Sequence, residues 1–273
     1  MRIPRCLSPL FRFPPRLSIL VLISLLAGCQ SMPDTSSGTF VSRQIESGGK
    51  SYRYQVFVPA AALRHGRTPV VLFLHGSGER GSDGALQTQA GLGPYLRSHA
   101  DSFPAIVVFP QSPLERSWDG DIAQMAFDTL DAATGEFNGD PQRTYLTGMS
   151  RGGYGTWQMA LMQPRRFAAL APVCGGITQP NVDTPLVVDA VAASPDPFAA
   201  AAAGLKHIPT WIFHGGKDDV VPPQQSQRMY AAMQAAGADV HYTEWPQANH
   251  NSWDLTYADP QLWQWMWQQQ RQP

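Results

Sequence analysis

The chain has 273 residues, of which 43% are hydrophobic and 15% are charged. This apolar content is enough for one full-sized core, so we expect one domain rather than several. The chain carries 20 basic and 21 acidic residues. This balance excludes the strongly basic surface typical of a nucleic-acid-binding protein, and we expect no nucleic-acid partner.

The first 28 residues have the organisation of a bacterial export signal. They contain four arginines and no acidic residue, and the apolar run 17–27 (LSILVLISLLA) is 11 residues long. A membrane-spanning helix needs about 20 apolar residues, so this run fits the core of a signal peptide instead. The run ends in Leu26-Ala27-Gly28-Cys29, which resembles the bacterial lipobox. In a lipobox, the cysteine receives a diacylglyceryl group and becomes the new N-terminus after cleavage.

We therefore expect a signal peptide over residues 1–28, a lipid anchor on Cys29 and a flexible, polar tether over residues 29–38. The alternative is an ordinary secretory signal in which Cys29 is incidental. The lipoprotein interpretation predicts a membrane-anchored protein of the bacterial cell envelope, on the periplasmic side or the surface. Gln30, directly after the cysteine, favours the outer membrane. Only Cys174 then remains in the folded domain, where we expect a buried thiol and no internal disulfide.

Beyond the tether, apolar runs alternate with stretches of helical character. Ser47-Gly48-Gly49-Lys50 separates two β-rich runs and predicts a hairpin. Most later runs are continuously apolar, as in strands covered on both faces. They occupy residues 69–74, 105–110, 143–147, 167–173, 209–213 and 240–244, and the helical stretches occupy 94–100, 122–137, 152–163, 223–236 and 261–271. The pattern predicts an α/β domain over residues 39–273, with a mostly parallel central sheet, an N-terminal antiparallel hairpin and helices on both faces.

The segment Gly148-Met149-Ser150-Arg151-Gly152 matches the G-x-S-x-G pattern of a nucleophile elbow. The strand-like run RTYLT precedes it and the helical run GGYGTWQMALMQ follows it. The glycines allow the close backbone approach that a sharp strand-to-helix turn requires. We therefore predict the α/β-hydrolase fold with Ser150 as the nucleophile. The alternative is a glycine-rich turn that contains a serine without a catalytic role.

A serine hydroxyl needs a base to remove its proton and a carboxylate to hold that base, and in this fold the chain order is Ser, acid, His. His250 lies in a loop after the last expected strand and before the final helix, where the fold places its base. The other histidines fit less well, because they precede Ser150 or lie in a helix, a strand or the loop before a strand; they are His65, His75, His99, His207 and His241. His214 ends a strand in His-Gly-Gly, and we interpret it as a turn residue.

Asp218 and Asp219 are adjacent carboxylates that follow the expected strand PTWIF. Asp218 falls at the acid position of the pattern H-G-x-x-D-x-x-V-P, which leaves Asp219 to face solvent or cap the next helix. The tetrahedral intermediate also needs two backbone N–H donors, for which we predict Arg151, after the nucleophile, and Ser77, in the H-G-x-G segment after the third strand. We expect Glu79 and Arg80 to form an ion pair that orders the same loop.

Several motifs taken together resemble one family. The segments LHGSGERG, FPQS…W, GMSRGGYGTW, HGGKDDVVP and NHNSW follow one another over residues 70–253. They are similar to the predicted-peptidase and polyhydroxybutyrate-depolymerase-like esterases of the α/β-hydrolase superfamily, which are relatives of feruloyl and acetylxylan esterases. The resemblance implies a Ser150–Asp218–His250 triad and a carboxylesterase that cleaves small-molecule or polymer esters through an acyl-enzyme.

The sequence leaves two other functions possible. Distant kinship with prolyl oligopeptidases suggests a peptidase or amidase, although this chain lacks the large β-propeller with which those enzymes select peptides. A non-catalytic envelope binding protein on the same scaffold would lack triad members. Trp118 and Trp253 are candidate substrate contacts or, equally, loop-packing residues. The sequence shows no metal-ligand cluster, phosphate-binding glycine loop or dinucleotide fingerprint, so we expect hydrolysis without a cofactor or metal.

Overall fold

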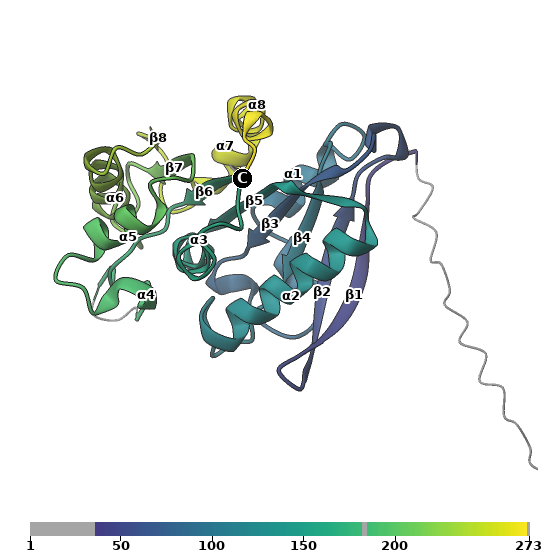
Figure 1. Ribbon diagram of the computed structural model, residues 1–273, viewed down its shortest axis with the longest axis horizontal. Helices are drawn as coiled ribbons and strands as arrows, with labels where there is room; N and C mark the ends of the chain where they lie inside the picture. Colours follow the sequence, from purple (N-terminus) through teal and green to yellow (C-terminus); the bar gives the residue numbers. More distant parts are fainter. Residues whose placement is uncertain (1–35, 182–184, 272–273) are drawn as a thin grey trace, which may run out of the picture. The chain divides into compact units, whose positions relative to one another are not determined.

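The computed structural model describes residues 36–181 and 185–271 (Figure 1). The expected signal peptide, Cys29 and most of the expected tether lie outside these residues. The strands are β1 (Thr39–Ser47), β2 (Lys50–Val58), β3 (Thr68–Leu74), β4 (Ile106–Pro110), β5 (Gly139–Met149), β6 (Ala169–Val173), β7 (Thr210–Gly215) and β8 (Val240–Trp245). The helices are α1 (Leu92–Ser98), α2 (Gly120–Glu136), α3 (Arg151–Met162), α4 (Asp189–Ala192), α5 (Pro197–Leu205), α6 (Gln224–Ala235), α7 (Trp253–Ala258) and α8 (Pro260–Gln268). Within the described ranges, no helix is both long enough and apolar enough to cross a membrane.

The N-terminal strands form the hairpin that the sequence predicts. β1 pairs antiparallel with β2, and Ser47 lies opposite Lys50 at the turn. Gly48 and Gly49 both have positive φ angles, 56° and 75°, which a two-residue hairpin turn of this twist requires and which glycine adopts without strain. The N–H of Gly38 already donates to the Ala100 carbonyl at 2.9 Å, so ordered packing begins inside the segment expected to be a tether.

The strands form one sheet in the order β1-β2-β4-β3-β5-β6-β7-β8. All pairings from β4 to β8 are parallel, whereas β2 pairs antiparallel with β4. The carboxyl ends of the parallel strands therefore lie along one edge of the sheet, which we call the carboxyl edge. Because β2 runs in the opposite direction, the start of β2 lies at this same edge, with Tyr54 opposite Pro110. The predicted fold class is confirmed: this is the α/β-hydrolase fold.

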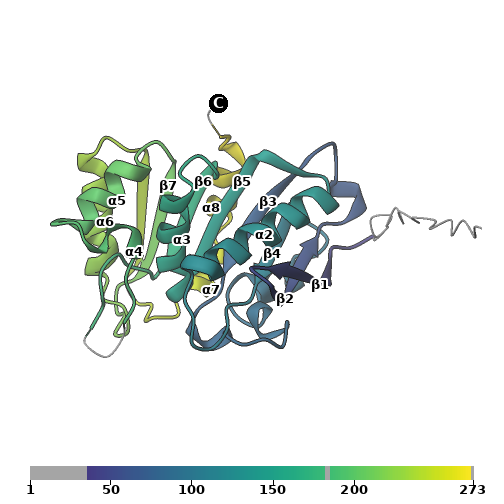
Figure 2. The same cartoon turned by 60° about the horizontal axis from the view of Figure 1, so that its bottom comes forward.

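Helices cover both faces of the sheet (Figure 2). Helices α2, α3 and α6 pack on one face, and α1 and α8 join the apolar core on the other. Strands β3 and β4 are buried almost throughout, which explains their continuously apolar sequences. The irregular stretch 175–205 contains α4 and α5; α5 packs against α3 and α6, so this stretch contributes to the helical layer.

Helix α3 begins unusually close to the sheet. A Cβ atom added to Gly152 would lie 1.9 Å from the Leu74 carbonyl oxygen, and one added to Gly148 would lie 2.3 Å from the Gly152 oxygen. Backbone atoms cannot yield as a flexible side chain does. The contact between β3, β5 and the first turn of α3 therefore requires glycine at both positions.

We expect Gly152→Ala to reduce the free energy of unfolding by about 1–3 kcal/mol or more, because the added methyl group overpacks a backbone contact. Gly135→Ala is the matched control, since nothing lies within 4 Å of its added Cβ in helix α2. Gly135 lies in the last turn of α2, so replacing it by alanine should leave the stability unchanged or raise it by up to about 0.5–1 kcal/mol. Urea unfolding of the two variants measures both effects, and equal stability of Gly152→Ala and wild type would contradict this packing argument.

Candidate active site

Ser150 lies in a strained turn between β5 and α3. Its φ and ψ angles are 56° and −119°, a combination that side-chain-bearing residues rarely adopt. Its N–H donates to the Val173 carbonyl at 2.9 Å, and its own carbonyl accepts from the N–H groups of Gly153 and Tyr154. These bonds to β6 and α3 hold the turn in place. The side chain is 9% exposed, at the carboxyl edge of the sheet.

The structure brings the three predicted triad residues together. His250 Nε2 lies 2.9 Å from Ser150 Oγ, and His250 Nδ1 lies 2.7 Å from Asp218 Oδ2. Asp218 follows β7, and His250 lies in the loop between β8 and α7. The carboxylate can only accept, so the Nδ1–H donates to it and leaves Nε2 to accept the serine proton. The arrangement is that of a nucleophile, a base and a residue that orients the base.

The Asp218 carboxylate is buried and fully hydrogen-bonded. Its Oδ1 accepts from the backbone N–H groups of Val220 and Val221, each at 2.9 Å. Burial raises the pKa of Asp218, but hydrogen bonds from His214, His250 and Val221 and the charge of His250 together lower that pKa well below its usual range. The carboxylate is therefore ionised at working pH. The neighbouring Asp219 is exposed.

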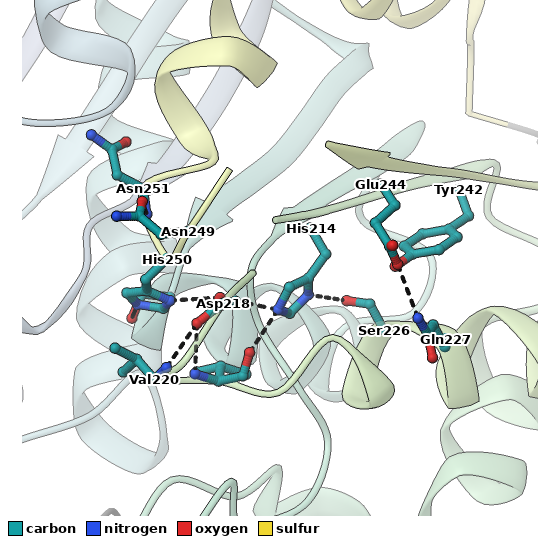
Figure 3. A network of polar contacts seen from close by, with 12 residues as sticks. His214, Asp218, Val220, Ser226, Gln227, Tyr242, Glu244, Asn249, His250 and Asn251 are labelled. Atoms are coloured by element: carbon teal, nitrogen blue, oxygen red, sulfur yellow. Dashed lines mark hydrogen bonds and ion pairs between the residues drawn. The ribbon is translucent and has the colours of Figure 1, made fainter. Parts of the chain in front are cut away.

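His214 also contacts the triad acid, which the sequence interpretation as a turn residue missed. Its ring is fully buried, with Nε2 3.1 Å from Asp218 Oδ2 and 2.8 Å from the Val221 carbonyl (Figure 3). Both of these partners are acceptors, so Nε2 carries a hydrogen. The Ser226 hydroxyl, 2.7 Å from Nδ1, completes the contacts of the ring. The four-residue spacing in His-Gly-x-x-Asp was the only available sequence signal for this contact.

The two residues predicted to supply oxyanion donors lie side by side. Ser77 begins the short 3₁₀ helix η2 (Ser77–Glu79) after β3, and Arg151 begins α3. Arg151 Nε donates to Ser77 Oγ at 3.0 Å, which connects the two segments. His75 supports the same loop: its Nε2 accepts from the Ser112 N–H at 3.0 Å, and burial lowers its pKa to about 4. The His75 ring is thus neutral at working pH.

The structure decides between the two alternatives for Trp118 and shows that the expected Glu79–Arg80 ion pair is wrong. Trp118 is 1% exposed, and its indole N–H donates to the His75 carbonyl at 3.1 Å. It therefore packs the loop of residues 75–80, which we call the oxyanion loop, and has no open face for a substrate. Arg80 forms no ion pair with Glu79; its guanidinium donates to the carbonyls of Ser77 and Leu114. By contrast, Trp253 is partly exposed with its ring centroid 5.5 Å from that of His250, so it stays a candidate substrate contact.

Cys174 adds a third possible metal ligand beside Asp218 and His250. One ligand atom from each of these three residues lies within 4.8 Å of the others. Burial raises the pKa of the Cys174 thiol, however, and a thiol binds metal as the thiolate. Asp218 and His250 are also already hydrogen-bonded to each other. The donor set thus suits an acid–base pair better than a metal centre, and Cys174 is the buried thiol that the sequence predicts.

Comparisons with known proteins agree with this geometry. A sequence profile of the prolyl oligopeptidase family matches residues 187–270, which include Asp218 and His250. The poly(3-hydroxyoctanoate) depolymerase of Pseudomonas fluorescens is 29% identical over 232 residues, which are 78% of this chain and 79% of the depolymerase. A solved thermostable esterase superposes with a TM-score of 0.67 at 29% identity, over 85% of this chain and 63% of that one. The protein is a serine hydrolase of the esterase kind.

Two other relatives resemble this chain less closely: one matches only part of its sequence, and the other shares only its fold. A bifunctional acetylxylan esterase/xylanase of Neocallimastix patriciarum is 30% identical over 162 residues, which are 58% of this chain and 20% of that enzyme. A solved ferulic acid esterase has a TM-score of 0.63 at 16% identity, over 85% of this chain and 97% of that one. This chain thus spans less than two thirds of the length of the bifunctional enzyme and of the solved thermostable esterase.

The contact from His214 gives a prediction about pH. His214→Met removes the N–H donor, so the pKa of Asp218 rises and the acid limb of the kcat/KM profile moves to higher pH. Misplacement of the carboxylate should also lower kcat by up to about 100-fold. His214→Gln keeps a donor near the Nε2 position and should restore most of both properties. Identical pH profiles for the Met and Gln variants would show that His214 only fills space.

Proposed function

We propose that the esterase hydrolyses carboxylic esters through an acyl-enzyme on Ser150. The observation that carries this proposal is the continuous hydrogen-bonded chain from Ser150 through His250 to Asp218. Ser150 Oγ attacks the ester carbonyl carbon while His250 Nε2 takes the hydroxyl proton. His250 then gives that proton to the leaving alkoxide, and the C–O ester bond breaks. In the second half, water attacks the acyl carbon while His250 takes its proton; the bond to Ser150 Oγ then breaks, His250 returns the proton to that oxygen, and the acid leaves.

The oxyanion of each tetrahedral intermediate would lie against the backbone N–H groups of Arg151 and Ser77. The Arg151 group belongs to the first turn of α3, where the helix dipole also favours negative charge. Each donor of this kind contributes about 3 kcal/mol to lowering the barrier. A donor lowers the barrier by this amount only if it is held in position before the substrate binds. The contacts of His75, Arg80 and Trp118 hold the oxyanion loop in this way.

We further propose that the substrate is an ester with apolar chains, such as a hydroxyalkanoate polymer or its oligomers. Three of the exposed large hydrophobic side chains lie in the segments that carry the site. Leu114 and Val220 lie within five residues of the ends of β4 and β7, and Leu255 follows His250 by five residues. Exposed apolar side chains next to a reactive centre favour an apolar ligand. The name of the depolymerase relative supports the same substrate class.

The triad predicts how strongly variants of Ser150 and of the two adjacent aspartates change the turnover of an ester. Ser150→Ala should lower kcat for p-nitrophenyl butyrate by about 10⁶-fold. Asp218→Asn should lower it by about 10⁴-fold, whereas Asp219→Asn, one residue away and exposed, should keep wild-type activity. A fluorophosphonate probe should label the wild type and not Ser150→Ala. Undiminished turnover by Ser150→Ala would end this mechanism, and faster cleavage of matched amides than of esters would favour a peptidase.

We also propose that the esterase is anchored by lipid at Cys29 in the bacterial envelope. The support is the sequence of residues 1–29: a basic segment, a short apolar run and the lipobox-like Leu26-Ala27-Gly28-Cys29. The full chain expressed in a bacterium should incorporate labelled palmitate and sediment with membranes. Cys29→Ser should abolish the label, while Cys174→Ser, which alters the buried thiol, should keep it. Absence of label from the wild-type protein would contradict the anchor.

A further inference from the structure

A cavity of about 620 Å³ opens beside the oxyanion loop. It is lined by the β1–β2 hairpin, by the segment after β3 and by the segment after β4. We call it the cationic cavity, because its lining includes Lys50, Arg53 and Arg116 and no acidic residue. Ser150, Asp218 and His250 are not part of its lining. The proposed reaction therefore leaves the role of this cavity unexplained.

The cavity and the oxyanion loop share a continuous wall. Ser77, the proposed oxyanion donor, precedes the lining residue Gly81 by four residues, a length of chain that spans at most about 14 Å. The Gly81 N–H donates to the Ser112 carbonyl at 2.9 Å, and Arg80 connects the same loop to Leu114. The separation across the sheet comes from the strand spacing, because β2 lies three strands from β5, or about 14 Å.

The side chains that line the cavity carry positive charge only, and one of them has no paired carboxylate. Arg53 makes no ion pair or hydrogen bond with any residue in ranges 36–181 and 185–271. Lys50 and Arg116 share a single carboxylate, Asp121, with Lys50 Nζ 3.7 Å from its oxygen. The nearby Asp83 keeps its negative charge, although its Oδ1 accepts the N–H groups of Ala85 and Leu86, and Asp119 also acts electrostatically on Arg116. The Arg53 guanidinium is thus the cation of the lining that no carboxylate pairs with among the described residues, on an enzyme whose residues 29–273 carry 16 basic and 21 acidic side chains.

We propose that the cationic cavity binds the terminal carboxylate of an oligomeric hydroxyacid ester while an ester bond further along the same chain lies at Ser150. The inference rests on the proposed function. A linear hydroxyacid oligomer has a hydroxyl at one end and a carboxylate at the other, and the carboxylate belongs to the alcohol that leaves. Arg53, assisted by Lys50 and Arg116, would hold this end of the leaving group by charge-assisted hydrogen bonds.

The separation sets the length of the piece that is released. A 3-hydroxyacid repeat contributes four atoms to the chain, so it spans about 4.5 Å by scaling from the three-atom peptide repeat. The separation of about 14 Å then corresponds to roughly three repeats. The esterase should therefore release trimeric acids from the carboxylate end, and an oligomer of two repeats should be too short to reach both sites.

The test uses linear 3-hydroxyoctanoate oligomers of two to five repeats, each with a free carboxylate or with a primary amide at that end. We expect the wild-type enzyme to prefer the carboxylate form of tetramer and pentamer by about three- to tenfold in kcat/KM, and to show no preference for dimers. Mass spectrometry should identify the trimeric acid as the main early product. The preference should decrease at high NaCl, because exposed ion pairs are screened.

Variants distinguish carboxylate binding in the cationic cavity from a general effect of the net charge of the protein. Arg53→Gln should abolish most of the carboxylate preference and broaden the product distribution, whereas Arg53→Lys should keep part of both. Lys206→Gln is the matched control, because Lys206 is exposed and precedes β7 at the opposite edge of the sheet. It removes the same charge and should keep the wild-type preference. An equal loss in the Arg53→Gln and Lys206→Gln variants would overturn the proposal.

Two further results would overturn it, and they differ in what they say about the proposed function. Equal cleavage of carboxylate and amide oligomers at every length would remove the cationic cavity from substrate binding and leave the esterase mechanism intact. Failure to cleave any oligomer, together with normal turnover of p-nitrophenyl butyrate, would reject the polymer substrate as well. Loss of p-nitrophenyl butyrate turnover itself would contradict the esterase mechanism.

Discussion

The active site depends on the close approach of β5 and α3 at Ser150. The serine holds a positive φ of 56° that costs conformational free energy, and bonds to the Val173 carbonyl and from two N–H groups of α3 offset this cost. Gly148 and Gly152 make the approach possible, because any Cβ there would collide with backbone. The turn raises one hydroxyl above the carboxyl edge, where the loops after the neighbouring strands can reach it.

A shell of buried polar groups holds the reacting residues in place. The Asp218 carboxylate accepts two backbone N–H groups and two imidazole N–H groups, so both its charge and its orientation are set before a substrate binds. The oxyanion loop has an equivalent support in His75, whose ring is neutral and joins the loops after β3 and β4. Such pre-organisation lowers the barrier, because little reorganisation remains for the reaction step.

Because β2 is antiparallel to β4, the cationic cavity lies at the same carboxyl edge of the sheet as the active site. The start of β2 lies beside the end of β4, and β3 is the next strand, so a cavity with three cations adjoins the oxyanion loop. An apolar polymer chain with one charged end matches both features. The exposed Leu114 and Val220 would contact the chain, and the cationic cavity would determine which ester bond reaches Ser150.

The sequence by itself determined the strands, the Gly48-Gly49 hairpin, the strand–turn–helix around Ser150 and the candidate acid and base, because each of these depends on a short segment. It did not find α5 or α7, left two roles open for Trp118, missed the contact of His214 with Asp218, and wrongly predicted a Glu79–Arg80 ion pair. Trp118 and Arg80 take their partners, His75 and Leu114, from segments far away in the chain. His214 reaches Asp218 only four residues on, but its ring is held by Ser226 of α6. Only the tertiary structure decided these contacts, because strand order places loops side by side in an arrangement that no local pattern encodes.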